Sequence, residues 1–237
     1  MKRTFYLLVV VAACLLSSSA QALTPIGPPV ATLDRGQLAA GFGYGHSKGD
    51  VVAHAFGFKF KVEDIEVDTY MANIFLGLDD AVELQIDLGA TLYDAVEMSS
   101  SGDFAGGFGV KTTFAKSDKI KWGAAFSMHW FEASGSGVTL GTPWTEEDTL
   151  TEIQVAVGPS YKDGLWRLYG GPFLHFIDGE AKGTIAGVPI SGDFKEDSNF
   201  GGFLGLMVDL NDNTAFGIEY QQTGSANFLG GSIRFAF

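Results

Sequence analysis

Strict alternation of apolar and polar or small residues is clearest in the sequence VELQIDLGATL, residues 82–92. Side chains at every second position of a β-strand point to the same face. One face of this segment would therefore be entirely apolar, and the other would carry Glu83, Gln85, Asp87, Gly89 and Thr91. The pattern predicts a strand with one face against an apolar medium and the other against a polar one.

The same period of two recurs along the chain from Gly36 onward. It predicts ten strands, at residues 36–46, 65–78, 82–93, 104–116, 120–133, 149–161, 165–177, 199–210, 214–222 and 227–237. Short connections rich in Asp, Asn, Ser and Gly alternate with longer polar segments at 47–64, 94–103, 134–148 and 178–198. Tight turns would then lie at one end of the molecule and long loops at the other.

This arrangement is typical of an all-β, transmembrane, antiparallel up-and-down β-barrel. The count of about ten strands could change to eight or twelve by one hairpin. Residues 51–62 carry an alternation of their own and could extend the first hairpin beyond the membrane. A soluble β-sandwich is the alternative fold.

Composition excludes several classes of protein. The 237 residues include 15 Lys and Arg against 28 Asp and Glu, a formal net charge of −13. Such an acidic chain repels phosphate, so a nucleic-acid binder is excluded. A hydrophobic content of 46% excludes a disordered chain. After residue 22 there is no run of 18 apolar residues, so a membrane-spanning helix is not expected.

Residues 1–22 are predicted to be a secretory signal peptide. Two basic residues precede an apolar run over 5–16, and Ala20-Gln21-Ala22 supplies the small-x-small site for cleavage after Ala22. Cleavage would remove Cys14, the only cysteine, so no disulfide is expected in the mature chain. Acylation of Cys14 in a lipobox is the alternative.

The last nine residues carry a resemblance to a known family. The ending LGGSIRFAF, residues 229–237, is apolar at every second position and closes on Phe. It is similar to the terminal signal that bacterial outer-membrane β-barrels present to their insertion machinery, here Ile233, Phe235 and Phe237. With the signal peptide and the strand pattern, it makes the chain resemble the small outer-membrane barrel superfamily that includes OmpA-like, OmpW-like and opacity-type proteins.

The resemblance implies a location in the outer membrane of a Gram-negative bacterium, with lipid and lipopolysaccharide as partners and the tight turns in the periplasm. Residues 23–35 contain Pro25, Pro28 and Pro29, which do not fit a central strand. They are expected to be an extended periplasmic lead-in, and residues 36–237 to be the barrel.

Charged residues in the polar phase of the strands would line the lumen. They are Glu83, Asp87, Lys111, Lys121, Glu152, Arg167, Asp209, Glu219 and Arg234, together with the neutral Gln154 and Gln221. Five acids and four bases come close to charge balance, so they are expected to form a polar network that fills the interior. Glycines in the same phase leave space, so a narrow pore lined by these residues is the alternative.

The sequence does not predict a catalytic or metal site. Ser127 and His129 would share one face of a strand, as a nucleophile and base require, but Glu132 would lie on the opposite face. His129 is therefore expected to be a polar lumen residue, as is His175. His46 and His54 are at best a weak metal pair.

Two acidic groups would lie at the predicted outer loops: Asp64, Glu66 and Asp68, and Glu146, Glu147 and Asp148. They are similar to the acidic residues of omptin-like proteases, which are ten-stranded barrels whose strands project far from the membrane. The predicted strands are too short for such a projection, so solvated acidic loops are expected. These loops could bind divalent cations together with lipopolysaccharide phosphates.

The sequence predicts a non-enzymatic outer-membrane barrel without cofactor, which interacts through its extracellular loops. A narrow cation-preferring pore for ions or small solutes is the main alternative, and an outer-membrane hydrolase is the other.

Overall fold

The computed structural model describes residues 23–55, 58–95, 98–99, 103–139, 142–196 and 198–237. The signal peptide predicted for residues 1–22, with its cleavage site and Cys14, lies outside the described residues. The strands are β1 (Leu38–Ala55), β2 (Phe58–Asp79), β3 (Val82–Ala95), β4 (Met98–Ser99), β5 (Asp103–Lys116), β6 (Ile120–Thr139), β7 (Thr142–Asp163), β8 (Trp166–Ile185), β9 (Val188–Glu196), β10 (Phe200–Asn211), β11 (Thr214–Thr223) and β12 (Ala226–Ala236). Within these ranges, no helix has the length and apolar character needed to cross a membrane.

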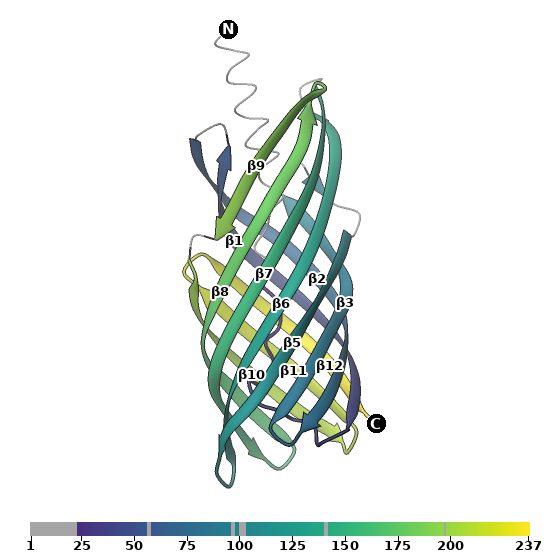
Figure 1. The fold of residues 1–237 in the computed structure, drawn as a ribbon, viewed down its shortest axis with the longest axis vertical. Coiled ribbons are helices and arrows are strands. Elements are labelled where there is room, and N and C mark those ends of the chain that lie inside the picture. Colours follow the sequence, from purple (N-terminus) through teal and green to yellow (C-terminus); the bar gives the residue numbers. More distant parts are fainter. Residues whose placement is uncertain (1–22, 56–57, 96–97, 100–102, 140–141, 197) are drawn as a thin grey trace.

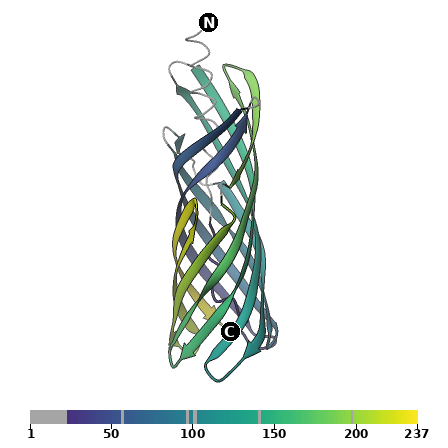
Figure 2. The same cartoon turned by 90° about the vertical axis from the view of Figure 1, so that its left-hand side faces the viewer.

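Ten of these strands pair in a closed antiparallel ring. Figures 1 and 2 show the resulting barrel. Consecutive strands pair around the ring, β3 pairs with β5, β8 pairs with β10, and β12 returns to β1. The closing ladder runs from Ala39 opposite Ala236 to Gly49 opposite Ala226. The ten-stranded barrel predicted from the sequence is confirmed. Closure of the ring satisfies the backbone polar groups within lipid, where water is absent.

The four short connections, at 80–81, 117–119, 164–165 and 212–213, lie together at one end, here called the tight-turn end. Ion pairs join neighbouring turns there, Lys119 Nζ to Asp163 Oδ1 at 2.7 Å and Lys162 Nζ to Asp209 Oδ2 at 2.8 Å. The hydrogen bond from Lys119 to Asp163 raises the pKa of Lys119 above its ordinary value. These pairs are exposed to solvent and contribute little to stability.

The opposite end corrects the prediction of long loops at 47–64, 134–148 and 178–198. Most of these residues continue the strands: β6 and β7 pair as far as Thr139 opposite Thr142, and β8 and β9 as far as Ile185 opposite Val188. β1 and β2 continue to Ala55 opposite Phe58, so the first hairpin is extended, which is one of the possibilities that the alternation over 51–62 left open. β9 lies outside the ring and pairs with β1 above the short β10, β11 and β12.

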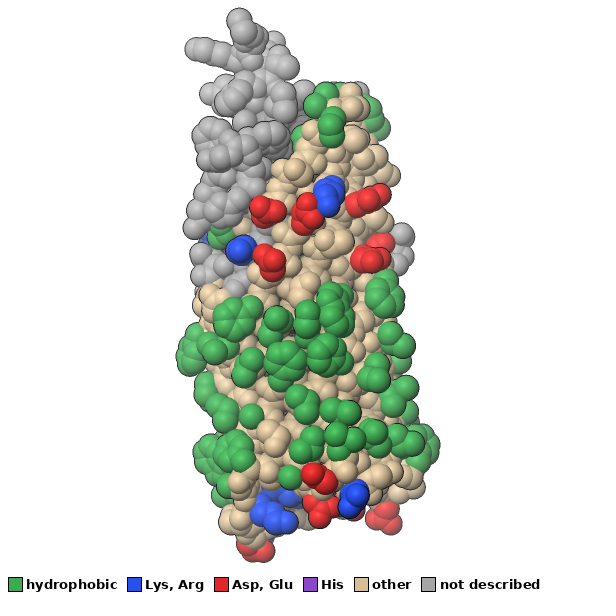
Figure 3. All heavy atoms as spheres, in the orientation of Figure 1, with side chains coloured by type: hydrophobic (Ala, Val, Ile, Leu, Met, Phe, Trp, Pro, Cys, Tyr) green, Lys and Arg blue, Asp and Glu red, His purple; other side chains and the backbone are tan. Residues whose placement is uncertain are grey.

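A change of polarity along each strand explains why these residues form strands. On the outward face of β8, Leu174 and Phe176 are followed by the charged Asp178, Glu180 and Lys182. On its inward face, the polar His175 is followed by buried apolar residues, Ile177, Ala181 and Ile185. Figure 3 shows the result on one face of the molecule, an apolar band with charged side chains beyond it at both ends.

The strand residues beyond this band, at the end opposite the tight turns, are called the outer extension: 46–55, 58–68, 132–139, 142–151, 178–185 and 188–196. Where the side chains of the outer extension are described, most apolar ones face inward, as in a water-soluble sheet, and most polar ones face outward. Glu146 and Asp148 are buried exceptions, and Val138 and Val188 are exposed ones. The period of two is kept while its apolar phase is exchanged. Strand ends predicted from the outward apolar residues therefore fall short of the observed strand ends.

Residues 23–35 also differ from expectation. They do not lead in from outside the barrel but lie within it, where Leu23, Val30 and Leu33 are buried. This part of the chain is called the luminal segment. It leaves the lumen at the tight-turn end, where Gly36 adopts a positive φ and its N–H donates to the carbonyl of Gly77 at 2.7 Å.

Candidate functional site

The luminal segment is held by side chains of the barrel wall. Its three prolines have no N–H, and the remaining backbone donors have no neighbouring strand, so they need other acceptors. Glu219 on β11 supplies two of them: Oε1 accepts from Ile26 N and Oε2 from Gly27 N, both at 2.8 Å. Gln221 Nε2 also donates to Glu219 Oε1 at 2.8 Å, which fixes the carboxylate.

The opposite wall holds the next part of the segment. Glu83 Oε2 on β3 accepts from Thr32 N at 2.8 Å, from Thr32 Oγ1 at 2.8 Å and from Leu33 N at 3.1 Å. Thr113 Oγ1 accepts from Ala31 N at 3.0 Å, and Arg234 Nη1 donates to Thr32 Oγ1 at 2.9 Å. The segment is thus bound to β3, β5, β11 and β12, and it crosses the lumen between them.

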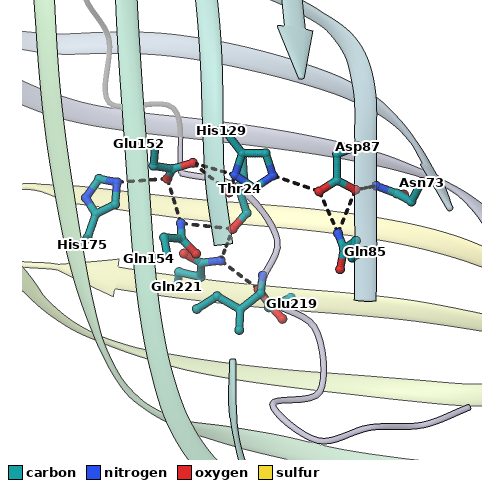
Figure 4. A network of polar contacts seen from close by, with 11 residues as sticks. Thr24, Asn73, Gln85, Asp87, His129, Glu152, Gln154, His175, Glu219 and Gln221 are labelled. Carbon is teal, nitrogen blue, oxygen red and sulfur yellow. Dashed lines mark hydrogen bonds and ion pairs between the residues drawn. The ribbon is translucent and has the colours of Figure 1, made fainter. Parts of the chain in front are cut away.

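A polar network crosses the lumen beside the start of the segment, as Figure 4 shows. His129 on β6 bridges two carboxylates, with Nε2 at 3.0 Å from Asp87 Oδ2 and Nδ1 at 3.5 Å from Glu152 Oε2. Glu152 Oε1 lies 3.0 Å from His175 Nε2 on β8. The chain of contacts therefore runs from β3 through β6 and β7 to β8.

Thr24 joins this network to the luminal segment. Its hydroxyl lies 3.1 Å from His129 Nδ1 and donates to Glu152 Oε2 at 2.8 Å. Its carbonyl accepts from Gln154 Nε2 at 3.3 Å and from Gln221 Nε2 at 2.7 Å. All five side chains are buried, so the bonds matter because a buried polar group without a partner is costly.

Six of the nine charged residues predicted for the lumen are buried inside the barrel: Glu83, Asp87, Lys111, Glu152, Glu219 and Arg234. The other three, Lys121, Arg167 and Asp209, are half-buried toward the tight-turn end. The two predicted lumen histidines, His129 and His175, lie in the network. Sequence reasoning missed Thr24 and the whole luminal segment, because an aperiodic proline-rich stretch gives no phase that would point it inward.

Ser127 and His129 do not form a nucleophile–base pair. Both ring nitrogens of His129 are directed to other groups, Nε2 to Asp87 and Nδ1 to Thr24 and Glu152. Ser127 lines a separate small cavity beside Gln154. Glu132 is exposed on the outward face, as expected.

The two acidic groups at the predicted loops are not brought together, since β2 and β7 are not neighbours in the barrel. On β2, Asp68 accepts from Tyr44 Oη at 2.7 Å and lies 2.9 Å from His46 Nδ1, and Glu66 pairs with Lys48 at 3.3 Å. On β7, Glu146 and Asp148 face inward and Glu147 faces outward. The side chains of Asp64 and His54 lie outside the described residues.

Across the described ranges, no three His, Cys, Asp or Glu residues are grouped as a metal ion would require. The prediction that the strands are too short to project from the membrane, as those of omptin-like proteases do, is wrong: β6, β7 and β8 extend well beyond the apolar band.

Ile233 and Phe235 of the predicted assembly signal lie on the outward face of β12. Ile233 stands opposite Phe42 and Phe216, and Phe235 is exposed. Phe237 N donates to the carbonyl of Leu38 at 2.9 Å, which places the end of the chain beside the start of β1.

Besides the small cavity at Ser127, which Pro25 and Ile26 also line, two further cavities lie beside the luminal segment. One, with about 60 Å³ open to the centres of water molecules, is lined by the segment, β1, β2, Lys111 and Arg234. The other, with about 190 Å³ by the same measure, opens at the tight-turn end and is lined by Arg167, Asp209 and neighbouring turns. Arg234 and Met207 line both cavities and therefore stand between them.

Comparisons with known proteins agree with this architecture. The family described as outer membrane protein beta-barrel domain matches residues 9–235. The chain is similar in structure to the outer membrane protease OmpT from Escherichia coli, with a TM-score of 0.51 and 11% identity, over 92% of this chain and 100% of that one.

It is also similar to the translocator domain of the autotransporter NalP from Neisseria meningitidis, with a TM-score of 0.49 and 11% identity, over 86% and 90%. An outer membrane channel from Pseudomonas putida F1 gives a TM-score of 0.45 and 11% identity, over 91% and 100%. No curated protein matches the sequence. At such identities the likeness to OmpT concerns the barrel fold alone.

Proposed function

Since the chain belongs to the outer membrane protein beta-barrel domain family, we propose that it is a sealed barrel that acts at the cell surface through its outer extension, without enzymatic activity. The luminal segment is the observation that carries this proposal. It crosses the lumen and is bound to opposite walls by Glu83 and Glu219. In barrels of this family the tight turns face the periplasm and the other end faces outward.

The outer extension is the surface available for interaction. Just beyond the apolar band it presents ion-paired charges, including Glu66 with Lys48, Glu180 with Lys182 and Asp178 with Lys195. In an outer membrane, charges just beyond the apolar band would lie beside the head groups of lipopolysaccharide. We propose lipopolysaccharide as the lipid partner, with divalent cations bridging these carboxylates to its phosphates.

A narrow pore is the second candidate. The inner and outer cavities beside the luminal segment are separated by the side chains of Arg234 and Met207, which line both. A small movement of these side chains would connect them. Their charged linings contain more bases than acids, which does not favour the cation preference expected from the sequence.

Planar-bilayer conductance separates the sealed barrel from the pore. The chain beginning at Leu23 is compared with a variant beginning at Asp34, which lacks most of the luminal segment. A matched deletion replaces residues 135–146 by Asn-Gly, joining Ser134 to Glu147, which already stand opposite each other. We expect steady openings from the Asp34 variant alone. Steady openings from the full chain would refute the sealed barrel, and a closed Asp34 variant would refute the role of the segment.

Contact with lipopolysaccharide is tested by thermal unfolding in bilayers. We expect Mg²⁺ to raise the melting temperature in lipopolysaccharide bilayers more than in phospholipid bilayers. The double variant D178N/E180Q should lose this difference, whereas E147Q, farther along the extension, should keep it. An equal effect of Mg²⁺ in both lipids would contradict the proposed partner.

A further inference from the structure

Two buried cations in the lumen have more hydrogen-bond donors than acceptors around them. Lys111 on β5 is 6% exposed and Arg234 on β12 is 9% exposed. Within the described part of the chain, no side chain or carbonyl accepts a hydrogen bond from Lys111 Nζ, and Arg234 Nη2 has no partner. Arg234 Nη1 is engaged, at 2.9 Å from Thr32 Oγ1 and 3.3 Å from Glu83 Oε1.

Most oxygens of the nearby carboxylates already accept hydrogen bonds, and the exception is Glu83 Oε1, which lies 3.3 Å from Arg234 Nη1 without a hydrogen-bond partner. Glu219 accepts two backbone N–H groups and Gln221, and Glu83 gives one oxygen to the luminal segment and faces Arg234 with the other. Asp87 accepts from Asn73 at 2.6 Å, from Gln85 at 2.8 Å and 2.9 Å, and contacts His129 at 3.0 Å. The donors left without a protein acceptor therefore belong to Lys111 and Arg234.

Both cations line the same cavity. The space of about 60 Å³ lies between the luminal segment and the glycine-rich parts of β1 and β12. Phe75 joins the two, since the Arg234 guanidinium lies 4.0 Å and Lys111 Nζ 5.8 Å from its ring centroid. A water molecule needs roughly 10–15 Å³ by this measure, so the cavity has room for a group of several heavy atoms.

We propose that this cavity binds a small inorganic oxyanion of the phosphate type between Lys111 and Arg234. An oxyanion offers several acceptors at once, and a guanidinium and an ammonium are the groups that bind it best in proteins. The anion would enter from the tight-turn end, where Lys162 and Arg167 line the outer cavity and Arg234 separates it from the inner one.

The test is a titration of the refolded chain from Leu23 with inorganic phosphate, followed by calorimetry at constant ionic strength. We expect saturable binding that K111Q weakens at least tenfold. K111Q is the main variant because Lys111 donates no hydrogen bond to any residue that the structure describes, whereas R234Q removes a bond to the luminal segment. K119Q is the matched control, since it removes an exposed base at the tight-turn end and should bind phosphate like the parent.

Three results would overturn the proposal. The folded parent shows no saturable phosphate binding, which would leave water as the occupant; K111Q binds phosphate as tightly as K119Q; or chloride competes as well as sulfate does, which would make the site a halide site. The readout is binding and not conductance, so its failure is distinct from failure of the sealed-barrel proposal.

Discussion

The carboxylate of Glu219 accepts backbone hydrogen bonds from the luminal segment, as the carbonyl groups of a neighbouring strand would in a sheet. A buried backbone N–H without an acceptor costs about 1–3 kcal/mol, and Glu219 accepts from two such groups at 2.8 Å. Residues that could be read as pore lining are, in this fold, acceptors for the chain's own backbone. Their removal therefore acts on stability as well as on the lumen.

We expect Glu219→Ala to lower the free energy of unfolding by about 2–4 kcal/mol, because Ile26 N and Gly27 N lose their acceptor together. Urea unfolding in lipid vesicles measures the loss. Glu132→Ala, an exposed carboxylate on β6, is the control and should change stability by about 0.5 kcal/mol or less. Equal losses in both variants would show that Glu219 does not hold the segment.

β7 and β8 approach closely at Gly158. A Cβ on Gly158 would collide with the carbonyl oxygen of Gly170 and lie 3.2 Å from Gly171 Cα. These are backbone atoms, so a side chain cannot simply turn away. Gly158→Ala should cost about 1–3 kcal/mol of unfolding free energy.

The control for this substitution is Gly202→Ala, whose added Cβ meets no atom closer than 3.8 Å. It should be close to neutral in the same vesicle-unfolding assay. If both alanine variants unfold at the same urea concentration as the parent, β7 and β8 can accommodate a Cβ at Gly158 and the predicted collision does not occur.

The inward placement of Glu83 and Asp87 could be predicted from the alternation over 82–92, because a period of two assigns every second side chain to one face. Their partners could not. The donors to Glu83 are Thr32 and Leu33, in a proline-rich stretch without periodicity, and backbone N–H groups leave no signature in a sequence. The sequence therefore predicts which side chains form the polar network, but it does not predict that they bind the luminal segment.

At the scale of a strand, the boundary of the lipid lies where the outward face changes from apolar to polar and the inward face from polar to apolar. On the outward face of β6, Phe126 lies within the apolar band, whereas Ser136 lies in the outer extension. The predicted strand ended at residue 133 because its outward apolar positions ended there. The backbone continues to pair because the inward face becomes apolar and supplies a core of its own.

This boundary predicts opposite responses to one charge on one face of β6. Phe126→Arg should lower the free energy of unfolding by about 2–4 kcal/mol, because a guanidinium would face the middle of the bilayer. Ser136→Arg should change it by about 0.5 kcal/mol or less. Unfolding in vesicles measures both, and a comparable cost at Ser136 would place the outer extension within lipid.

At the scale of the whole molecule, the barrel is one ring closed by β12 against β1, and its last residue sits at that seam. Phe237 is 78% exposed and contributes one backbone hydrogen bond, to Leu38. The ladder from Ala39 to Gly49 does not depend on it. Phe237 therefore contributes little to the stability of the folded barrel, whereas the resemblance to outer-membrane barrels implies that it acts during assembly.

Deletion of Phe237 should separate these two roles. We expect the shortened chain to refold in lipid vesicles with a free energy of unfolding within about 1 kcal/mol of the parent, since one exposed side chain and one hydrogen bond are lost. In cells, the amount of heat-modifiable, folded barrel should fall several-fold, because the insertion machinery would no longer find the terminal Phe. Phe216→Ala is the matched control, since it removes an exposed Phe beside Ile233 and leaves the terminus intact. A fall of vesicle stability and cellular yield together would make Phe237 a structural residue, and no fall in either would remove it from the assembly signal.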